Sequence, residues 1–322
     1  MNQKKKNILL TSIKAAISAA LIYFIITLID LEEFIGGIRN YPVWGLIAVV
    51  LAFCATVLIG GWRWRIFLRP FGKVPYWKLV GLHFIGYFFS NFLPSNVGGD
   101  VIRGYISGKE LGDMPAAYSA VIADRIAGFV TTLMLALIAL PFLPYRHSVF
   151  WATILLNSGF VFVILLFLLL PSKSGQFVKL LLSKLPGKFG EMLINFTRML
   201  RSYRQHPKIL LEGFIVSVLY QSSIILVIAW AGYYTNARML VPFYFVSVPL
   251  VFVISLLPVS LNAIGIREAS FAYFFELYGS TKGIGLLVSL ITLAMAVGAG
   301  IIGGIVFAFW NSARKREAEL ES

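Results

Sequence analysis

Residues 91–103 read NFLPSNVGGDVIR and interrupt an apolar stretch that runs over 79–113. A second apolar stretch, 242–278, is interrupted by LPVSLNAIGIR at 257–267. In each interruption, Leu-Pro is followed after eight residues by an arginine. The helical pieces on either side are about 14 residues, or about 21 Å, long, which is too short to cross ~30 Å of hydrocarbon. Both stretches therefore predict short helical hairpins that turn back at the interruption.

The composition of the chain places such hairpins in a membrane protein. Of its 322 residues, 59% are hydrophobic and 13% are charged, whereas soluble domains have about 25% charged residues. This excludes a soluble enzyme, a secreted module and a disordered chain. The net charge of +14 is compatible with nucleic acid or anionic lipid. In so apolar a chain, however, basic residues mark cytoplasmic loops, and we expect no nucleic-acid partner.

Charge placement predicts the sidedness of the membrane spans. Six segments are long and apolar enough to span a bilayer, namely 8–29, 43–61, 116–143, 149–170, 209–232 and 284–310. Basic residues cluster at 63–78, within 171–208 and at 314–316, so these regions and both termini are predicted to be cytoplasmic. The hairpin at 79–113 must then begin and end inside, and the hairpin at 242–278 must begin and end outside. A signal peptide, the alternative interpretation of the first segment, would have a shorter apolar region.

The two hairpin tips share one pattern, which favours an internal repeat. Pro94 and Pro258 end the incoming helices because proline lacks an N–H donor, and Gly98, Gly99 and Gly265 permit the turns. The outgoing helix then directs free N–H groups and a positive dipole end into the protein, where they attract an anion. Hairpins entering from opposite faces are typical of inverted-repeat transporters with a site at the midplane. Two unrelated Pro/Gly kinks are the alternative.

Charged residues inside the apolar stretches are the candidate functional residues. They are Asp100, Arg103, Asp124, Arg125, Arg267, Glu268 and Glu276. Each costs about 2.5–3.5 kcal/mol on insertion scales, so each needs a partner or a task. Arg103 and Arg267 offer planar donor forks for a phosphate. Asp100 can pair with Arg103 on one helix face, whereas Glu268 is expected to project away from Arg267. The alternative is that these charges pair only with one another to lock the bundle.

Two further segments have a structural interpretation. Apolar residues recur at helical spacing over 188–204, within the basic loop 171–208, and predict an amphipathic helix on anionic lipid, with a plain basic loop as the alternative. Ala296, Gly300 and Gly304 recur every four residues and predict a face for close helix packing. The GxGxxG pattern at 298–303 lies inside a span with no strand before it, so it does not predict a nucleotide site.

The sequence offers no metal or nucleophile chemistry. Cys54 is the single cysteine, which excludes an internal disulfide. His83, His147 and His206 lie far apart in sequence, which gives no support to a zinc cluster. We expect no catalytic residue, cofactor or metal.

Three ordered motifs resemble a known family. The runs 91–103, 123–128 (ADRIAG) and 257–268 resemble the motifs of the flippase-like membrane family named for the transmembrane region of lysylphosphatidylglycerol synthase. That family usually has glycine where Ala263 stands. The resemblance implies translocation of a lipid with a phosphate-containing or aminoacylated headgroup across a prokaryotic plasma membrane. Twelve residues follow the last predicted span, so we expect no soluble aminoacyl-transferase domain on this chain.

The predicted protein is a single all-α membrane domain over 1–322, with six spans and two re-entrant hairpins in an inverted repeat. The predicted headgroup-binding residues are Arg103, Arg267, Arg125, Asp100, Asp124, Glu268, Asn91, Asn96 and Asn262. The predicted partners are membrane lipids that are anionic or contain phosphate. Two other functions stay open at this point: the membrane component of a lipid-modifying system that relies on a separate soluble transferase, and a small-solute secondary transporter.

Overall fold

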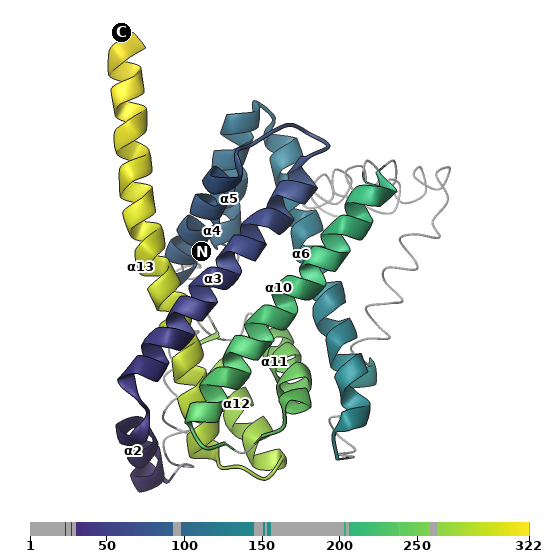
Figure 1. Ribbon diagram of the computed structural model, residues 1–322, viewed down its shortest axis with the longest axis vertical. Helices are drawn as coiled ribbons and strands as arrows, with labels where there is room; N and C mark the ends of the chain where they lie inside the picture. Colours follow the sequence, from purple (N-terminus) through teal and green to yellow (C-terminus); the bar gives the residue numbers. More distant parts are fainter. Residues whose placement is uncertain are drawn as a thin grey trace, which may run out of the picture.

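The computed structural model is a bundle of helices, most of which run along one common direction (Figure 1). The structure describes residues 23, 27, 30–92, 98–144, 151, 153–155, 203, 206–237, 239–257, 260 and 263–321. Within these residues the regular elements are all helical. The predicted all-α class is therefore confirmed for the described part of the chain.

Four helices are long and apolar enough to cross a membrane. They are α3 (Val43–Leu68), α6 (Met114–Ala139) with its 3-10 extension η1 (Leu140–Phe142), α10 (Pro207–Tyr234) and the Lys282–Trp310 part of α13 (Lys282–Glu321). They match the predicted spans 43–61, 116–143, 209–232 and 284–310. The predicted spans 8–29 and 149–170 lie almost entirely outside the described residues, as does the predicted amphipathic segment 188–204.

Helix α3 extends past the end that the sequence predicted. We placed Arg63 in a cytoplasmic loop that followed position 61, but the helix continues to Leu68 and Arg63 is buried within it. The predicted end of the helix was wrong because the positive charge of Arg63 was taken as the mark of a cytoplasmic loop. An acidic partner on α6, described below, offsets part of the cost of burying this guanidinium.

Four shorter helices form two pairs at opposite ends of the bundle. Helices α4 (Tyr76–Phe92) and α5 (Gly98–Leu111) pack together in the upper half of Figure 1, and α11 (Val241–Ser255) and α12 (Ile266–Leu277) pack together in the lower half. A further short helix, α2 (Leu31–Asn40), precedes α3. At 1.5 Å per residue, the four paired helices are about 18–26 Å long. None of the four therefore covers ~30 Å of hydrocarbon unless the bilayer is locally thinner.

The predicted small-residue face of α13 packs against α4. A Cβ on Gly303 would overlap the carbonyl oxygen of Phe84, and a Cβ on Gly304 would lie 2.9 Å from the Phe88 ring. Gly300 adjoins Asn91, whose side-chain amide donates a hydrogen bond to the Ala296 carbonyl at 3.0 Å. Because these positions lack bulk, the two helix backbones approach closely.

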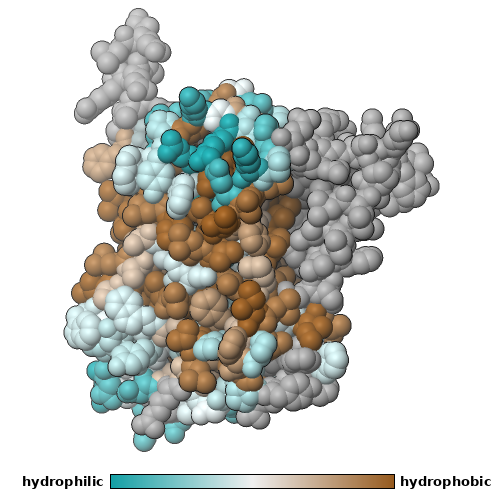
Figure 2. Space-filling model, turned by 45° about the vertical axis from the view of Figure 1, so that its right-hand side comes forward, coloured by the Kyte–Doolittle hydropathy of each residue, from teal (hydrophilic) through white to brown (hydrophobic). Residues whose placement is uncertain are grey.

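Apolar side chains cover the middle of one face of the bundle. Figure 2 shows hydrophobic side chains over the middle of one face and a hydrophilic group at its upper end. On α13, four apolar side chains are exposed at helical spacing, namely Val297, Ile301, Ile305 and Phe309. Exposed apolar surface on this scale fits contact with lipid, and the fold is that of a multi-pass membrane protein.

Candidate functional site

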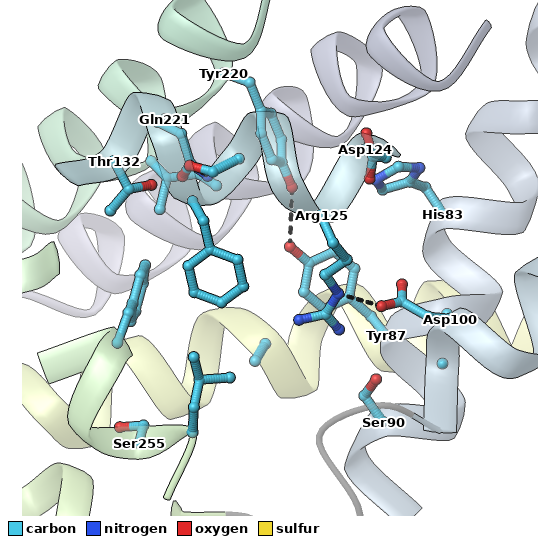
Figure 3. Close-up of a pocket in the computed structure, with 18 of the residues that line it drawn as sticks. His83, Tyr87, Ser90, Asp100, Asp124, Arg125, Thr132, Tyr220, Gln221 and Ser255 are labelled. Atoms are coloured by element: carbon cyan, nitrogen blue, oxygen red, sulfur yellow. Dashed lines mark hydrogen bonds and ion pairs between the residues drawn. The ribbon is translucent and has the colours of Figure 1, made fainter. Parts of the chain in front are cut away.

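A cavity of about 410 Å³ lies where the two short helix pairs meet the long helices. Helices α3, α4, α5, α6, α10, α11, α12 and α13 all contribute to its lining. Figure 3 shows 18 of the residues that line it. Six of the predicted headgroup residues line this one cavity: Asn91, Asp100, Arg103, Asp124, Arg125 and Arg267. The structure therefore brings together residues from both halves of the sequence.

A row of alternating charges forms one side of the cavity. Arg63 donates from Nε and Nη2 to the two carboxylate oxygens of Asp124, at 2.6 and 3.0 Å. Arg103 lies 3.4 Å from Asp124 and donates to Asp100 at 2.6 Å. Arg125 donates from Nε to the other oxygen of Asp100. Three guanidinium groups thus share two carboxylates, and the row carries one positive charge in excess.

The arginines of this row differ in how firmly they are held. The Arg103 guanidinium stacks 3.8 Å from the centre of the Trp64 ring, and its Nη1 lies 2.9 Å from Nδ1 of His83. Arg103 is 5% exposed, whereas 38% of the Arg125 side chain is exposed. Arg103 is therefore fixed on several sides, and Arg125 is the guanidinium that is more open to a ligand.

A hydroxyl pair and a buried donor extend the polar side of the cavity. The hydroxyl groups of Tyr87 and Tyr220 face each other at 3.4 Å (Figure 3). The Tyr220 ring also lies under the Arg63 guanidinium, 4.5 Å from ring centroid to Cζ. Among the described residues, Nη1 of Arg63 is buried without a hydrogen-bond partner. A buried donor left unmet costs about 1–3 kcal/mol, so this wall favours a ligand with acceptor oxygens.

The second half of the site is built differently. Arg267 donates from Nε to Glu268 Oε1 at 3.0 Å and to the Ser289 hydroxyl at 3.3 Å. The backbone N–H of Gly265 donates to Glu268 Oε2 at 2.6 Å. Glu268 does not project away from Arg267, as we had expected. The prediction was wrong because the carboxylate caps the N-terminus of α12, which turns it back toward its neighbour.

The turn residues divide into two kinds. Gly265 has φ 89° and Ala263 has φ 60°, so both adopt the left-handed conformation that glycine tolerates best. Gly98 and Gly99, which we placed in the first turn, instead begin α5, and Gly99 packs against the backbone of Gly86. The remaining predicted tip and headgroup residues lie outside the described part of the chain: Pro94, Asn96, Pro258 and Asn262.

Apolar side chains also line the cavity. They are Phe129, Ile224, Phe252, Val253, Leu256 and Leu293. The lining therefore combines paired charges with hydrocarbon side chains.

Sequence reasoning missed four residues of the polar wall: Arg63, His83, Tyr87 and Tyr220. Their signal was present in part, because His83, Tyr87 and Asn91 are polar residues at a spacing of four within the apolar helix α4. One predicted intramembrane charge lies elsewhere: Glu276 pairs with Lys282 at 3.2 Å and does not line the cavity. The described residues hold no group of three or more His, Cys, Asp or Glu side chains that suits a metal.

Comparison with known proteins gives a family match over most of the chain. The family described as "Lysylphosphatidylglycerol synthase TM region" matches residues 12–316. The UPF0104 membrane protein PH1989 of Pyrococcus horikoshii is 24% identical over 199 residues, which cover 53% of this chain and 59% of that protein. The match thus spans somewhat more than half the length of that relative. No solved structure matches the chain.

Proposed function

The chain belongs to the lysylphosphatidylglycerol synthase TM region family, and from this premise we propose that it is a lipid translocase. It moves a lipid with a phosphate-containing or aminoacylated headgroup between the leaflets of a prokaryotic plasma membrane. Membership of the family supports a role that involves membrane lipids. The step from that role to translocation rests on the shape and chemistry of the cavity.

The mixed lining of the cavity, which combines paired charges with hydrocarbon, is the observation that carries this proposal. A lipid headgroup is polar and a lipid tail is apolar, so a translocase needs a path that accommodates both. The charged row of Arg63, Asp124, Arg103, Asp100 and Arg125 lines the same cavity as the hydrocarbon side chains named above.

Each polar residue has a part in this function. Arg103, Arg125 and Arg267 bind the headgroup phosphate, for which guanidinium forks are well suited. Asp100, Asp124 and Glu268 balance those charges and contact a cationic headgroup. The side-chain amides of Asn91, Asn96 and Asn262 donate hydrogen bonds to the headgroup. With four guanidinium groups against three carboxylates around the site, the excess charge favours an anion.

The two short helix pairs supply the path in this proposal. The α4–α5 pair enters from the cytoplasmic face and the α11–α12 pair from the outer face, as re-entrant hairpins of an inverted repeat. Both chain termini then lie in the cytoplasm, since the basic segments follow the positive-inside rule. The positions of the pairs at opposite ends of the bundle support this arrangement (Figure 1).

Leaflet exchange in liposomes tests the proposal directly. The purified chain is reconstituted with fluorescent phosphatidylglycerol, its aminoacylated form or a polyprenyl phosphate, and an impermeant quencher is added outside. We expect quenching to extend to the inner-leaflet pool of at least one of these lipids. Quenching confined to the outer leaflet for all three, as in protein-free liposomes, would exclude translocation of these lipids. A soluble transferase that co-purifies with an exchange-inactive chain would instead indicate a lipid-modifying complex.

A further inference from the structure

The Asp100 carboxylate lies between two guanidinium groups on the wall of the cavity. One oxygen accepts from Arg103 Nη2 at 2.6 Å, and the other accepts from Arg125 Nε. Within the described part of the chain these two arginines are its hydrogen-bond partners, and Figure 3 shows the Arg125 side chain pointing at it. An anion held by two arginine forks is the arrangement that proteins use to bind a phosphate group.

The position of Asp100 suits a phosphate as well as it suits a carboxylate. Asp100 is in the first turn of α5, where the helix dipole favours negative charge. Its partners do not depend on it equally: Arg103 also contacts Asp124, Trp64 and His83. Arg103 therefore keeps its place without Asp100, and Arg125, whose side chain is 38% exposed, is the partner that an incoming anion can reach.

The corresponding carboxylate of the second half is not replaceable in this way. Glu268 is tied to the backbone of Gly265 at 2.6 Å and lies 3.3 Å from the Ser289 hydroxyl, in addition to Arg267. Loss of these contacts would uncap α12. The two halves therefore differ, although the sequence pattern treats them alike.

We propose that Asp100 occupies the place of the substrate phosphate and competes with it. A phosphate-bearing headgroup enters beside Arg125, takes over its fork and that of Arg103, and displaces the Asp100 carboxylate. The carboxylate keeps the empty site close to charge balance and weakens phosphate binding, so that the headgroup is released again. This inference rests on the proposed function for the lipid nature of the ligand, but not for the competition.

The variant Asp100→Asn tests the competition by binding. The full chain in detergent is titrated with dihexanoyl phosphatidylglycerol, with inorganic phosphate, and with dihexanoylglycerol, which has the same tails and no phosphate. Removal of a unit charge next to the ligand should tighten phosphatidylglycerol binding about tenfold. Glu110→Gln, which neutralises a carboxylate of the same helix at the cytoplasmic end and outside the cavity, should not tighten it.

The possible results separate clearly. Tighter binding of the phospholipid with no gain for dihexanoylglycerol supports the proposal. Equal or weaker phospholipid binding overturns it, because Asp100 would then hold the arginines in place for the ligand. A gain for inorganic phosphate alone overturns the assignment to a lipid headgroup.

The unmodified chain provides a second measurement that does not depend on how the variant folds. Binding of dihexanoyl phosphatidylglycerol should change a carboxylate band in the infrared difference spectrum, since Asp100 leaves its two arginines, and dihexanoylglycerol should not. No change in any carboxylate band at saturation overturns the proposal. Tighter binding by the variant in a chain that shows no leaflet exchange would refute the proposed function and leave this site assignment standing.

Discussion

Arg63 and Asp124, 61 residues apart in sequence, form a buried ion pair in which two guanidinium nitrogens meet two carboxylate oxygens at 2.6 and 3.0 Å. The pair joins α3 to α6 in the apolar part of the bundle. Removal of Arg63 leaves the Asp124 carboxylate buried with only its longer, 3.4 Å contact to Arg103. We therefore expect Arg63→Met to lower the free energy of unfolding by about 3–5 kcal/mol, measured by denaturant titration in detergent micelles.

A surface pair provides the matched control for this change. Arg69 and Glu212 also join a residue near the end of α3 to another helix, but their side chains are 46% and 48% exposed. Arg69→Met should cost at most about 1 kcal/mol. Equal losses for the two variants would show that the Arg63–Asp124 pair is solvated, contrary to its place in the bundle.

The long helices could be predicted from sequence, whereas the site could be predicted only in part. A membrane helix satisfies its backbone hydrogen bonds within one segment, so its hydropathy alone identifies it. Charges that pair in the fold can lie far apart in sequence. Arg63 was assigned to a loop because its partner Asp124, 61 residues away, could not be identified from the local sequence. Eight helices contribute residues to the cavity, and no local sequence pattern predicts which of their polar residues face one another.

Close packing between α4 and α13 predicts a strong effect of one methyl group. A Cβ at Gly303 would overlap the backbone oxygen of Phe84, which cannot turn away as a side chain can. Gly303→Ala should therefore destabilise the fold by about 1–3 kcal/mol. Gly36→Ala, in the interior of α2 with no atom within 4 Å of the added carbon, should stabilise it by about 0.5–1 kcal/mol. Thermal unfolding of both variants in one detergent checks the opposite signs.

The left-handed conformation of Ala263 predicts a gain from glycine. Its φ of 60° costs an L-residue about 1–2 kcal/mol. Glycine avoids this strain, but the larger conformational entropy of its unfolded chain offsets part of the gain in stability. Ala263→Gly should therefore raise the free energy of unfolding by about 0.5 kcal/mol. The same change at Ala136, inside α6, should lower it by about 1 kcal/mol. Destabilisation by Ala263→Gly would argue against the positive φ.

Cysteine labelling tests the arrangement of the two helix pairs. In a Cys54→Ser background, Lys78→Cys marks the start of α4 and Glu276→Cys marks the end of α12; both side chains are about half exposed. An impermeant maleimide added to intact cells should label Glu276→Cys alone, because the basic loop before α4 is predicted to be cytoplasmic. Permeabilised cells should show both labels. Labelling of both positions in intact cells would place the two pairs on one face and contradict the inverted repeat.

The partly exposed side chain of Arg125 should control the exchange rate most sensitively. Arg125→Lys keeps the charge but loses the planar fork that binds two phosphate oxygens, so we expect slower exchange than in the unmodified chain. Arg125→Ala loses both charge and fork and should slow it about tenfold or more, the equivalent of one charge-assisted hydrogen bond. Initial quenching rates at equal protein incorporation measure this order.

Lys78→Ala, which breaks the surface pair with Glu110 at 2.9 Å, is the control and should exchange at the unmodified rate. If Lys78→Ala slowed exchange as much as Arg125→Ala did, the effect would reflect general basic charge. Exchange that survives both Arg103→Ala and Arg267→Ala would place the headgroup site outside this cavity.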